Sequence, residues 1–241
     1  MRVCPELSRL PRAPRWSSVK FIRRAPGSVS SLLGPGIRDP VDPTHPAFGP
    51  KTNRNAFPLF EHDAFRMRAY PLALLEKSEW TPREIPPLPS VPENKKQVDM
   101  HLSIATSMKN TSKLAIVRVA IARRVKHALE LIIARGANSG TTNARERGPD
   151  GWQNVQKTII VFDDKEAKQM GPRWVLNGWM YIFHPTLRLY RMPYYELVSL
   201  LRSALQTLHA HGMFLEHRWT GIRARQPEKA RLCRAYHTSG I

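Results

Sequence analysis

The sequence predicts an α+β fold in which two amphipathic helices pack on one face of a small sheet. Apolar residues recur at helical spacing in residues 113–135 and again in 193–212. Strand patterns occur at 98–107, 157–164 and 173–192. The predicted order is therefore strand, helix, strands, helix, and proline-rich segments precede all of them.

The first predicted strand, residues 98–107 (VDMHLSIATS), alternates apolar and polar side chains, as a strand with one buried face does. A polar turn follows it, in which Thr111 or Ser112 can cap the next helix. That helix is predicted from Lys113 to Arg135, and Gly136 is expected to end it. Its buried stripe consists of Leu114, Val117, Ile121, Val125, Ala128 and Ile132.

The segment after this helix contains both a loop and strands. Residues 136–151 are polar and rich in glycine, which predicts a loop that is mobile or ordered only by a partner. Residues 157–164 (KTIIVFDD) form a continuous apolar run, which is typical of a buried central strand. Residues 173–192 hold one or two more strands, with a turn at Asn177-Gly178.

The second helix is predicted over 193–212, since Pro193 suits a first turn and Gly212 a C-terminus. Its apolar stripe consists of Leu197, Leu201, Ala204, Leu205 and Leu208. Residues 213–241 then form a basic tail. The α+β domain is accordingly predicted to span residues 99–212.

Two segments precede this domain. Residues 1–38 are rich in arginine and serine and contain a single acid, which is typical of a mitochondrial transit peptide. An unstructured basic arm is the alternative. Residues 39–98 are punctuated by proline, which predicts an extended arm. Within this arm, residues 57–77 could form a short helix, which Pro71 would break or kink.

The charge of the chain indicates a polyanionic partner. Lysine and arginine number 38 and aspartate and glutamate 19, so that the formal net charge is +19. An excess of this size repels itself unless RNA, DNA or anionic lipid neutralises it. No apolar run approaches the roughly 18 residues that a membrane span needs. Two cysteines, near opposite ends of the chain, support neither a disulfide framework nor a cysteine zinc site.

Signatures of catalysis are few. The sequence lacks a phosphate-binding glycine loop, an H-E-x-x-H motif and a G-x-S-x-G motif. Asp163, Asp164 and Glu166 could hold a hydrated magnesium ion, but acids at strand ends are common. His209 and His211, two residues apart on a helix, point to different sides. We therefore predict no catalytic residue, metal ligand or cofactor, and a metal-dependent enzyme is a remote alternative.

Binding of RNA is the stronger prediction, because arginine forks bind two phosphate oxygens at once and the cations recur on several elements. The predicted RNA-binding residues are Lys109, Lys113, Arg118, Arg123, Arg124, Lys126, Arg188 and Arg191. Aromatic residues lie among the later cations and either stack on bases or fill the core. These aromatics are Trp174, Trp179, Tyr181, Phe183, Tyr190, Tyr194 and Tyr195.

Residues 102–135 resemble the core of the bacterial ribonuclease P protein component. In that family a strand ends in Ser-x-Lys, and a helix of the type A-V-x-R-N-x-x-K-R follows a short turn. The matching residues here are Ser107, Lys109, Ala115, Ile116, Val117, Arg118, Arg123, Arg124 and Lys126. The departures are Val119 for the expected Asn, Ala120 for a basic residue and His127 for Glu. Residues 178–208 resemble the last strand and helix of the family.

The resemblance implies a ribonuclease P protein-like fold (ribosomal S5 domain 2-like) with a left-handed crossover. It also implies that the basic helix contacts a catalytic RNA and that a cleft beside the sheet holds the single-stranded leader of precursor tRNA. The expected function is thus that of a protein cofactor in tRNA 5′ processing, in the mitochondrial matrix. The expected partners are transfer or ribosomal RNA and other ribonucleoprotein subunits. A structural protein of the mitochondrial ribosome is the alternative, and a nucleoid DNA-binding protein a more remote one.

Overall fold

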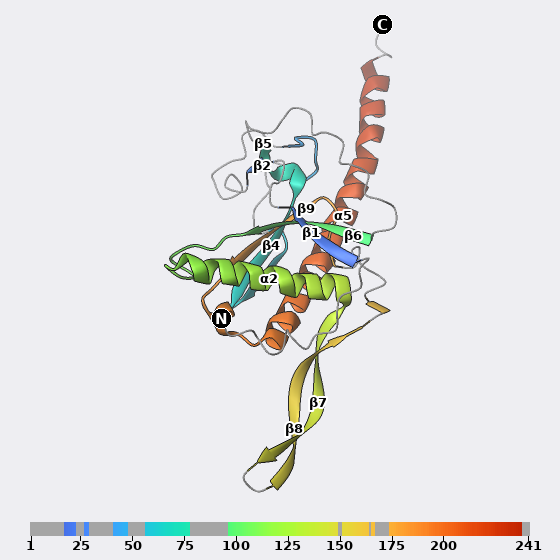
Figure 1. Ribbon diagram of the computed structural model, residues 1–241. Helices are drawn as coiled ribbons and strands as arrows, with labels where there is room; N and C mark the ends of the chain where they lie inside the picture. Colours follow the sequence, from blue (N-terminus) through green and yellow to red (C-terminus); the bar gives the residue numbers. More distant parts are fainter. Residues whose placement is uncertain are drawn as a thin grey trace.

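A five-stranded mixed sheet forms the centre of this computed structural model (Figure 1). The strands occur in the order β1 (Ser17–Ile22), β6 (Lys96–Ile104), β9 (Trp179–Pro185), β4 (Phe65–Pro71) and β3 (Leu59–His62). The first three strands run parallel, whereas β4 and β3 are antiparallel to their neighbours. The structure describes residues 17–22, 27–28, 41–47, 56–77, 96–148, 151–163, 165–166 and 174–237.

Two helices, α2 (Ala115–Arg135) and α5 (Tyr194–His237), pack on the sheet and on each other. The predicted α+β class is therefore confirmed. From α2 the core takes Ile121, Val125, Ala128 and Ile132, and from α5 it takes Leu197, Leu201, Ala204, Leu205 and Leu208. Each buried leucine, isoleucine or valine among them contributes about 1.5–3 kcal/mol to stability.

The ends of α2 lie close to their predicted positions. Gly136 adopts a φ of 60°, and its N–H donates to the carbonyls of Ile132 and Leu131, which confirms the predicted C-terminus. The capping prediction is wrong, because Leu114 is the N-cap residue and makes no side-chain cap. Leu114 is also 67% exposed, since the helix begins at the periphery of the molecule (Figure 1).

Residues 57–77 form strands, so the expectation of a short helix there is wrong. Phe65, Met67 and Ala69 are buried and alternate with polar or exposed neighbours, and this period of two is that of β4. After β4 the chain continues through the 3-10 turn η3 (Leu72–Leu74) to β5 (Glu76–Lys77). Part of the segment predicted as an extended arm thus belongs to the sheet.

The predicted loop over 136–151 is wrong as well, because β7 (Ala137–Gly148) pairs with β8 (Gly151–Phe162) along its whole length. This hairpin projects from the body of the molecule (Figure 1). The apolar run in β8 is consequently not a central strand, and Ile159 and Val161 are 37% and 45% exposed. Pairing between strands has overridden the low strand propensity of the polar β7 segment.

The hairpin is fastened to the body at its root. The guanidinium of Arg202 on α5 donates to the carbonyl of Ala137 at 3.2 Å and to Glu166 at 2.5–2.6 Å. The guanidinium of Arg135 lies 4.0 Å from the ring centre of Phe162, at the opposite end of the pairing from the turn. The two arginines therefore hold the first residue of β7 and the last residue of β8 against the helices.

Helix α5 continues through Gly212, so the predicted end at that residue is wrong. A Cβ on Gly212 would lie 2.2 Å from Cδ1 of Leu176, which shows that the glycine serves close packing and not helix termination. Beyond it, Leu215 and Trp219 are buried, and Trp179 Nε1 donates to Glu216 at 2.9 Å. The helix then extends to His237 through most of the predicted basic tail.

Part of the predicted transit peptide takes part in the fold. Strand β1 pairs in parallel with β6, and its Val19 and Phe21 pack against the core. A short strand, β2 (Gly27–Ser28), pairs with β5. The rest of residues 1–38 lies outside the described residues. Within the described ranges, no helix has the length and apolar character needed to cross a bilayer.

Candidate nucleic-acid interface

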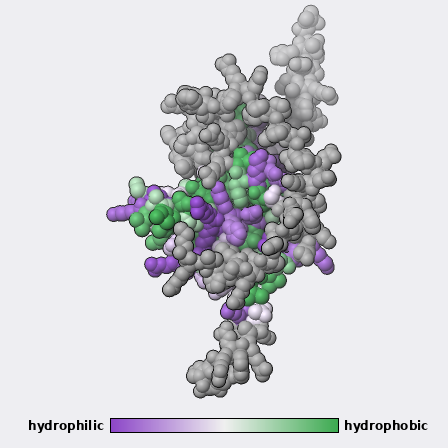
Figure 2. All heavy atoms as spheres, viewed as in Figure 1, coloured by the Kyte–Doolittle hydropathy of each residue, from purple (hydrophilic) through white to green (hydrophobic). Residues whose placement is uncertain are grey.

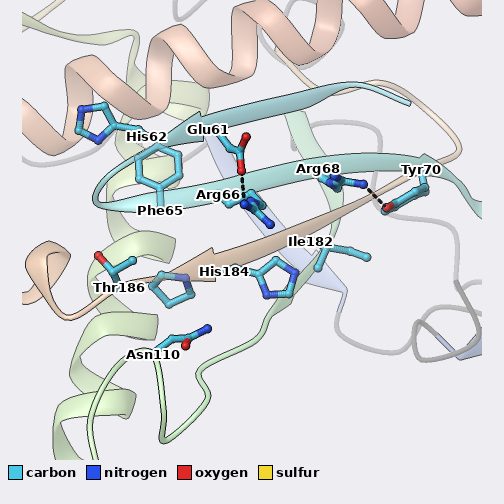
Figure 3. Close-up of a pocket in the computed structure, with 11 residues that line it drawn as sticks. Glu61, His62, Phe65, Arg66, Arg68, Tyr70, Asn110, Ile182, His184 and Thr186 are labelled. Carbon is cyan, nitrogen blue, oxygen red and sulfur yellow. Dashed lines mark hydrogen bonds and ion pairs between the residues drawn. The ribbon is translucent and has the colours of Figure 1, made fainter. Parts of the chain in front are cut away.

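A groove of about 610 Å³ lies on the sheet (Figure 3). Strands β3, β4 and β9 and the turn before α2 supply its walls. The residues that line it are Glu61, His62, Phe65, Arg66, Arg68, Tyr70, Asn110, Ile182, His184, Pro185 and Thr186. Several of these side chains carry charge or hydrogen-bonding groups.

Strand alternation places the polar side chains of the groove on the face away from the helices. Met67 of β4 and Phe183 of β9 point into the core beneath α5 and α2, so their neighbours point to the other face. Arg66 lies directly across from His184, and Arg68 from Ile182, in the antiparallel register of β4 and β9. One face of a single strand pair therefore presents two guanidinium groups and an imidazole.

The contacts within the groove leave it cationic. Arg66 forms an ion pair with Glu61, and both side chains are about half exposed (55% and 52%). Arg68 donates to the hydroxyl of Tyr70 at 3.4 Å. Partial burial, followed by the charges of Arg66 and Arg68, lowers the pKa of His184 below its ordinary value of 6.5. His184 is therefore neutral at neutral pH unless an anion enters the groove.

This arrangement suits the binding of phosphate groups more than catalysis or base stacking. The guanidinium groups of two neighbouring arginines can bind successive phosphates of a nucleic-acid strand. Tyr70 and Phe65 are 1% and 0% exposed, so their ring faces are not available for stacking. Asn110 is exposed at the rim and offers donors and an acceptor for base or sugar groups.

Two of the predicted RNA-binding arginines of α2 are engaged inside the molecule. Arg118 donates to the carbonyls of Ser112 and Lys113, each at 2.8 Å. Arg124 donates to the carbonyls of Tyr190 at 3.0 Å and of Met192, and its guanidinium lies 5.2 Å from the ring centre of Tyr194. These contacts give both arginines a structural role in positioning the chain around α2.

The other predicted residues lie on the turn before α2, on α2 itself and on α4 (Arg188–Arg191). Lys126 lies 5.7 Å from the ring centre of Phe21 on β1. Arg188, on the short helix α4, pairs with Asp63 at 3.2 Å, and this pair is largely solvent-exposed. The remaining predicted residues are exposed: Lys109, Lys113, Arg123 and Arg191.

For most of the aromatic residues the structure favours the core role over stacking on bases. Those with at most 2% exposure are Trp174, Trp179, Tyr181, Phe183 and Tyr194. Burial raises the pKa of Tyr181 to about 12, and its hydroxyl accepts from the N–H of Leu176 at 2.9 Å. Tyr190 is 42% exposed and Tyr195 is partly exposed, so these two can still contact a partner.

The acids considered for magnesium have other contacts. Asp163 Oδ1 accepts from the backbone N–H of Lys165 at 2.8 Å, and Glu166 is paired with Arg202. His209 and His211 lie on α5, where the first is partly buried and the second exposed. Among the described residues, no three His, Cys, Asp or Glu side chains are grouped as metal ligands would be.

The groove residues Arg66, Arg68 and His184 are not among the residues predicted from the sequence to bind RNA. A signal for the two arginines was present, because FRMRAY alternates apolar and cationic residues with a period of two. The proline-rich surroundings and the helical interpretation of 57–77 concealed it. Comparison with protein-family models, with curated proteins and with solved structures finds no match.

Proposed function

We propose that this protein binds RNA as a subunit of a mitochondrial ribonucleoprotein. The observation that carries the proposal is the groove in which Arg66, Arg68 and His184 share one face of β4 and β9. In a chain of net charge +19, such a groove attracts a polyanion and provides defined positions for its phosphates.

Single-stranded RNA fits this groove better than a duplex. The groove is a concave region of a sheet, and no described helix projects from it to enter a major groove. Sheet surfaces commonly bind unpaired strands, whose backbone can follow the strands and whose base edges remain accessible. Asn110 and Thr186 at the groove supply polar groups for such edges.

The test is the salt dependence of binding to single-stranded RNA, measured by fluorescence anisotropy with the full chain. Each phosphate contact on a single strand contributes roughly 0.7 to the slope of log K against log salt. The Arg66→Ala, Arg68→Ala double variant should therefore reduce the slope by about 1.4. A control variant, Lys165→Ala with Arg218→Ala, removes two exposed cations outside the groove. Equal slopes for the wild type and the groove variant would exclude the groove from the RNA interface.

Within this function, the first version is a protein cofactor of the ribonuclease P type. The parallel pairing of β6 with β9 across α2, and the helix α5 that follows, support it. So does a cationic cleft on the sheet. Against it, the family positions occupied by Val119 and Ala120 lack the expected polar and basic side chains. Accumulation of 5′-extended tRNA when the protein is depleted would favour this version.

The second version is a structural protein of the mitochondrial ribosome. The observation that favours it is the shape of the molecule, from which the β7–β8 hairpin and the end of α5 both project (Figure 1). Such projections can reach between RNA helices. A tagged chain should then sediment with a ribosomal subunit, and replacing residues 143–156 by Asn-Gly should release it. The replaced segment lies beyond the root contacts of Arg135 and Arg202, so the body should fold normally.

The composition of residues 1–38 supports a location in the mitochondrial matrix. Because Ser17–Ile22 supplies strand β1, a cleavage that removes the whole segment would strip an edge strand from β6. We therefore expect processing to occur before Ser17. Import into isolated mitochondria followed by N-terminal sequencing tests both the location in the matrix and the position of cleavage. A mature chain that begins after Ile22 would contradict cleavage before Ser17.

A further inference from the structure

The start of α2 carries an exposed apolar surface that the RNA-binding function does not use. Its four side chains, here called the α2 apolar patch, are Met108, Leu114, Ile116 and Val119, with exposed fractions of 66%, 67%, 83% and 49%. Figure 2 shows hydrophobic atoms gathered at this end of the molecule, beside hydrophilic ones. Ile116 and Val119 lie one turn apart on the helix, and Met108 and Leu114 belong to the segment that leads into it. Exposed aliphatic side chains of this kind commonly mark a contact with another macromolecule.

Hydrogen bonds hold the patch in one conformation. Thr111 is buried, and both its backbone N–H and its hydroxyl donate to the carbonyl of Ser107. Ser112 Oγ accepts from the N–H of Leu114 at 3.1 Å. Arg118 then closes the turn onto the helix through the carbonyls of Ser112 and Lys113. The patch is therefore preorganised, which lowers the entropy lost when a partner binds.

The helical geometry places two residues of the patch, Ile116 and Val119, on the side of α2 away from the core. At 100° per residue, Ile116 and Val119 lie on the side of α2 opposite buried Ile121, in line with exposed Arg123. Residue Val117, between them in sequence, packs against the core. The outward side of the first two turns of α2 is thus aliphatic and not cationic.

The charged residues near the patch in sequence are all positive. No aspartate or glutamate occurs between Asp99 and Glu130, whereas six lysines and arginines do. Lys109 and Lys113 are exposed next to the patch residues in sequence. A partner that covers the patch must therefore supply an apolar ridge bordered by carboxylates.

We propose that the α2 apolar patch is a docking site for an acidic protein partner. Aliphatic side chains have neither a π face for stacking nor donors for phosphate, so RNA would leave them without suitable contacts. A second copy of this chain would bring the same cations against Lys109 and Lys113. A membrane would favour a whole amphipathic helix, but the opposite side of α2 is already buried in the core.

The experiment places a photocrosslinking amino acid at Ile116 of the full-length chain in cells and digests RNA before purification. The expected result is one crosslinked protein whose contact peptide combines apolar residues with aspartate or glutamate. Lys109→Glu with Lys113→Glu should reduce its affinity by about tenfold or more. Exchange of the mapped acids of the partner for lysine should restore binding to that charge-reversed variant.

The matched control is Met213→Ser with Phe214→Ser on α5, which removes two other exposed apolar side chains (39% and 63%). This variant should leave the crosslink intact. The patch variant, Ile116→Ser with Val119→Ser, is tested with the crosslinking amino acid at Met108. It should abolish the crosslink without lowering the Tm. A crosslink to RNA or to a second copy of the chain would overturn the proposal, and so would binding of the purified chain to anionic vesicles that the Ile116→Ser, Val119→Ser variant loses. Retention of the protein partner by the Ile116→Ser, Val119→Ser variant would do so as well.

Discussion

Adjacent arginines on α2 have different roles because they point in different directions. Arg124 turns towards α4 and α5, where it donates to two backbone carbonyls and lies against Tyr194. Tyr194 in turn donates from its hydroxyl to the carbonyl of Arg124 at 3.1 Å. Arg123, one position earlier, is exposed. Arg124 therefore stabilises the contact between α2 and the segment that joins α4 to α5, whereas Arg123 is available to a partner.

Substitution of these two arginines should separate stability from binding. Arg124→Ala leaves carbonyl acceptors in a half-buried site, which should cost about 1–3 kcal/mol of unfolding free energy. Arg123→Ala, the matched control, should change it by less than about 0.5 kcal/mol. Urea denaturation followed by circular dichroism measures both values. Equal effects of the two substitutions would contradict the structural role of Arg124.

His184 should make RNA affinity depend on pH. Its pKa in the free groove is lowered, and a phosphate beside it would raise that pKa again. Binding then takes up a proton, so RNA affinity should increase as the pH falls from 7 through the pKa of the complex. His184→Gln should remove this increase. His62→Gln, at the same groove, is the control for any contribution from its other histidine.

The same lowered pKa makes the free protein less stable as the pH falls, whereas RNA affinity increases. The unfolded chain binds a proton at the ordinary pKa of 6.5, whereas folded His184 resists protonation until a lower pH. The contribution of His184 to stability is therefore full above pH 6.5 and is lost as the pH falls through its folded pKa. Thermal unfolding between pH 7.5 and 5 should show the wild type losing stability relative to His184→Gln as the pH falls.

At the scale of elements, the long helix α5 shows how one glycine can serve packing. Leu176, just before β9, occupies the space over Gly212, and the helix continues beyond this contact to bury Leu215 and Trp219. A glycine in a helix interior costs about 1 kcal/mol relative to alanine. The close approach of Leu176 to the helix, which the glycine permits, compensates for that cost.

Substitution of two glycines of α5 by alanine should therefore change the stability of the protein in opposite directions. Gly212→Ala should destabilise the protein by about 1–3 kcal/mol, because the new Cβ overlaps Leu176 in a packed region. Gly221→Ala should stabilise it by up to about 1 kcal/mol, since a Cβ there has no neighbour within 4 Å. Differential scanning calorimetry of both variants tests the pair. Stabilisation by both substitutions would refute the packing role of Gly212.

At the scale of the whole molecule, net charge and fold act against each other. The charge of +19 favours expansion of the free chain, and a compact sheet with two helices brings those cations together. Charges on the described surface are paired only in part, as between Arg188 and Asp63 or Arg66 and Glu61. Counterions or a polyanion must supply the rest of the neutralisation.

The stability of the free protein should therefore increase with salt. The Debye screening length shortens from about 30 Å at 0.01 M to about 10 Å at 0.1 M salt. This change weakens long-range repulsion more than it weakens contact ion pairs. The Tm should increase over this range by several degrees. A single-stranded RNA oligonucleotide at 0.01 M salt should raise it further than an uncharged polymer does. A Tm that decreases with salt would show that local ion pairs outweigh the repulsion.

The sequence by itself determined the elements whose signal is local. The period of α2 and its glycine end, the alternation of β6, and the turn at Asn177-Gly178 depend on residues within a few positions of one another. The apolar stripes of the two helices could be predicted for the same reason. Hydrophobic periodicity is a property of a short segment, so it can be read without knowledge of the partner.

Only the tertiary structure decided which segments pair and which side chains remain free. The polar β7 became a strand because β8 supplied its hydrogen bonds, and residues 57–77 became strands because β9 lay beside them. The partners of Arg124 lie 66 and 68 residues further along the chain. Contacts at that separation depend on the packing of the whole chain, and no local pattern in the sequence encodes them.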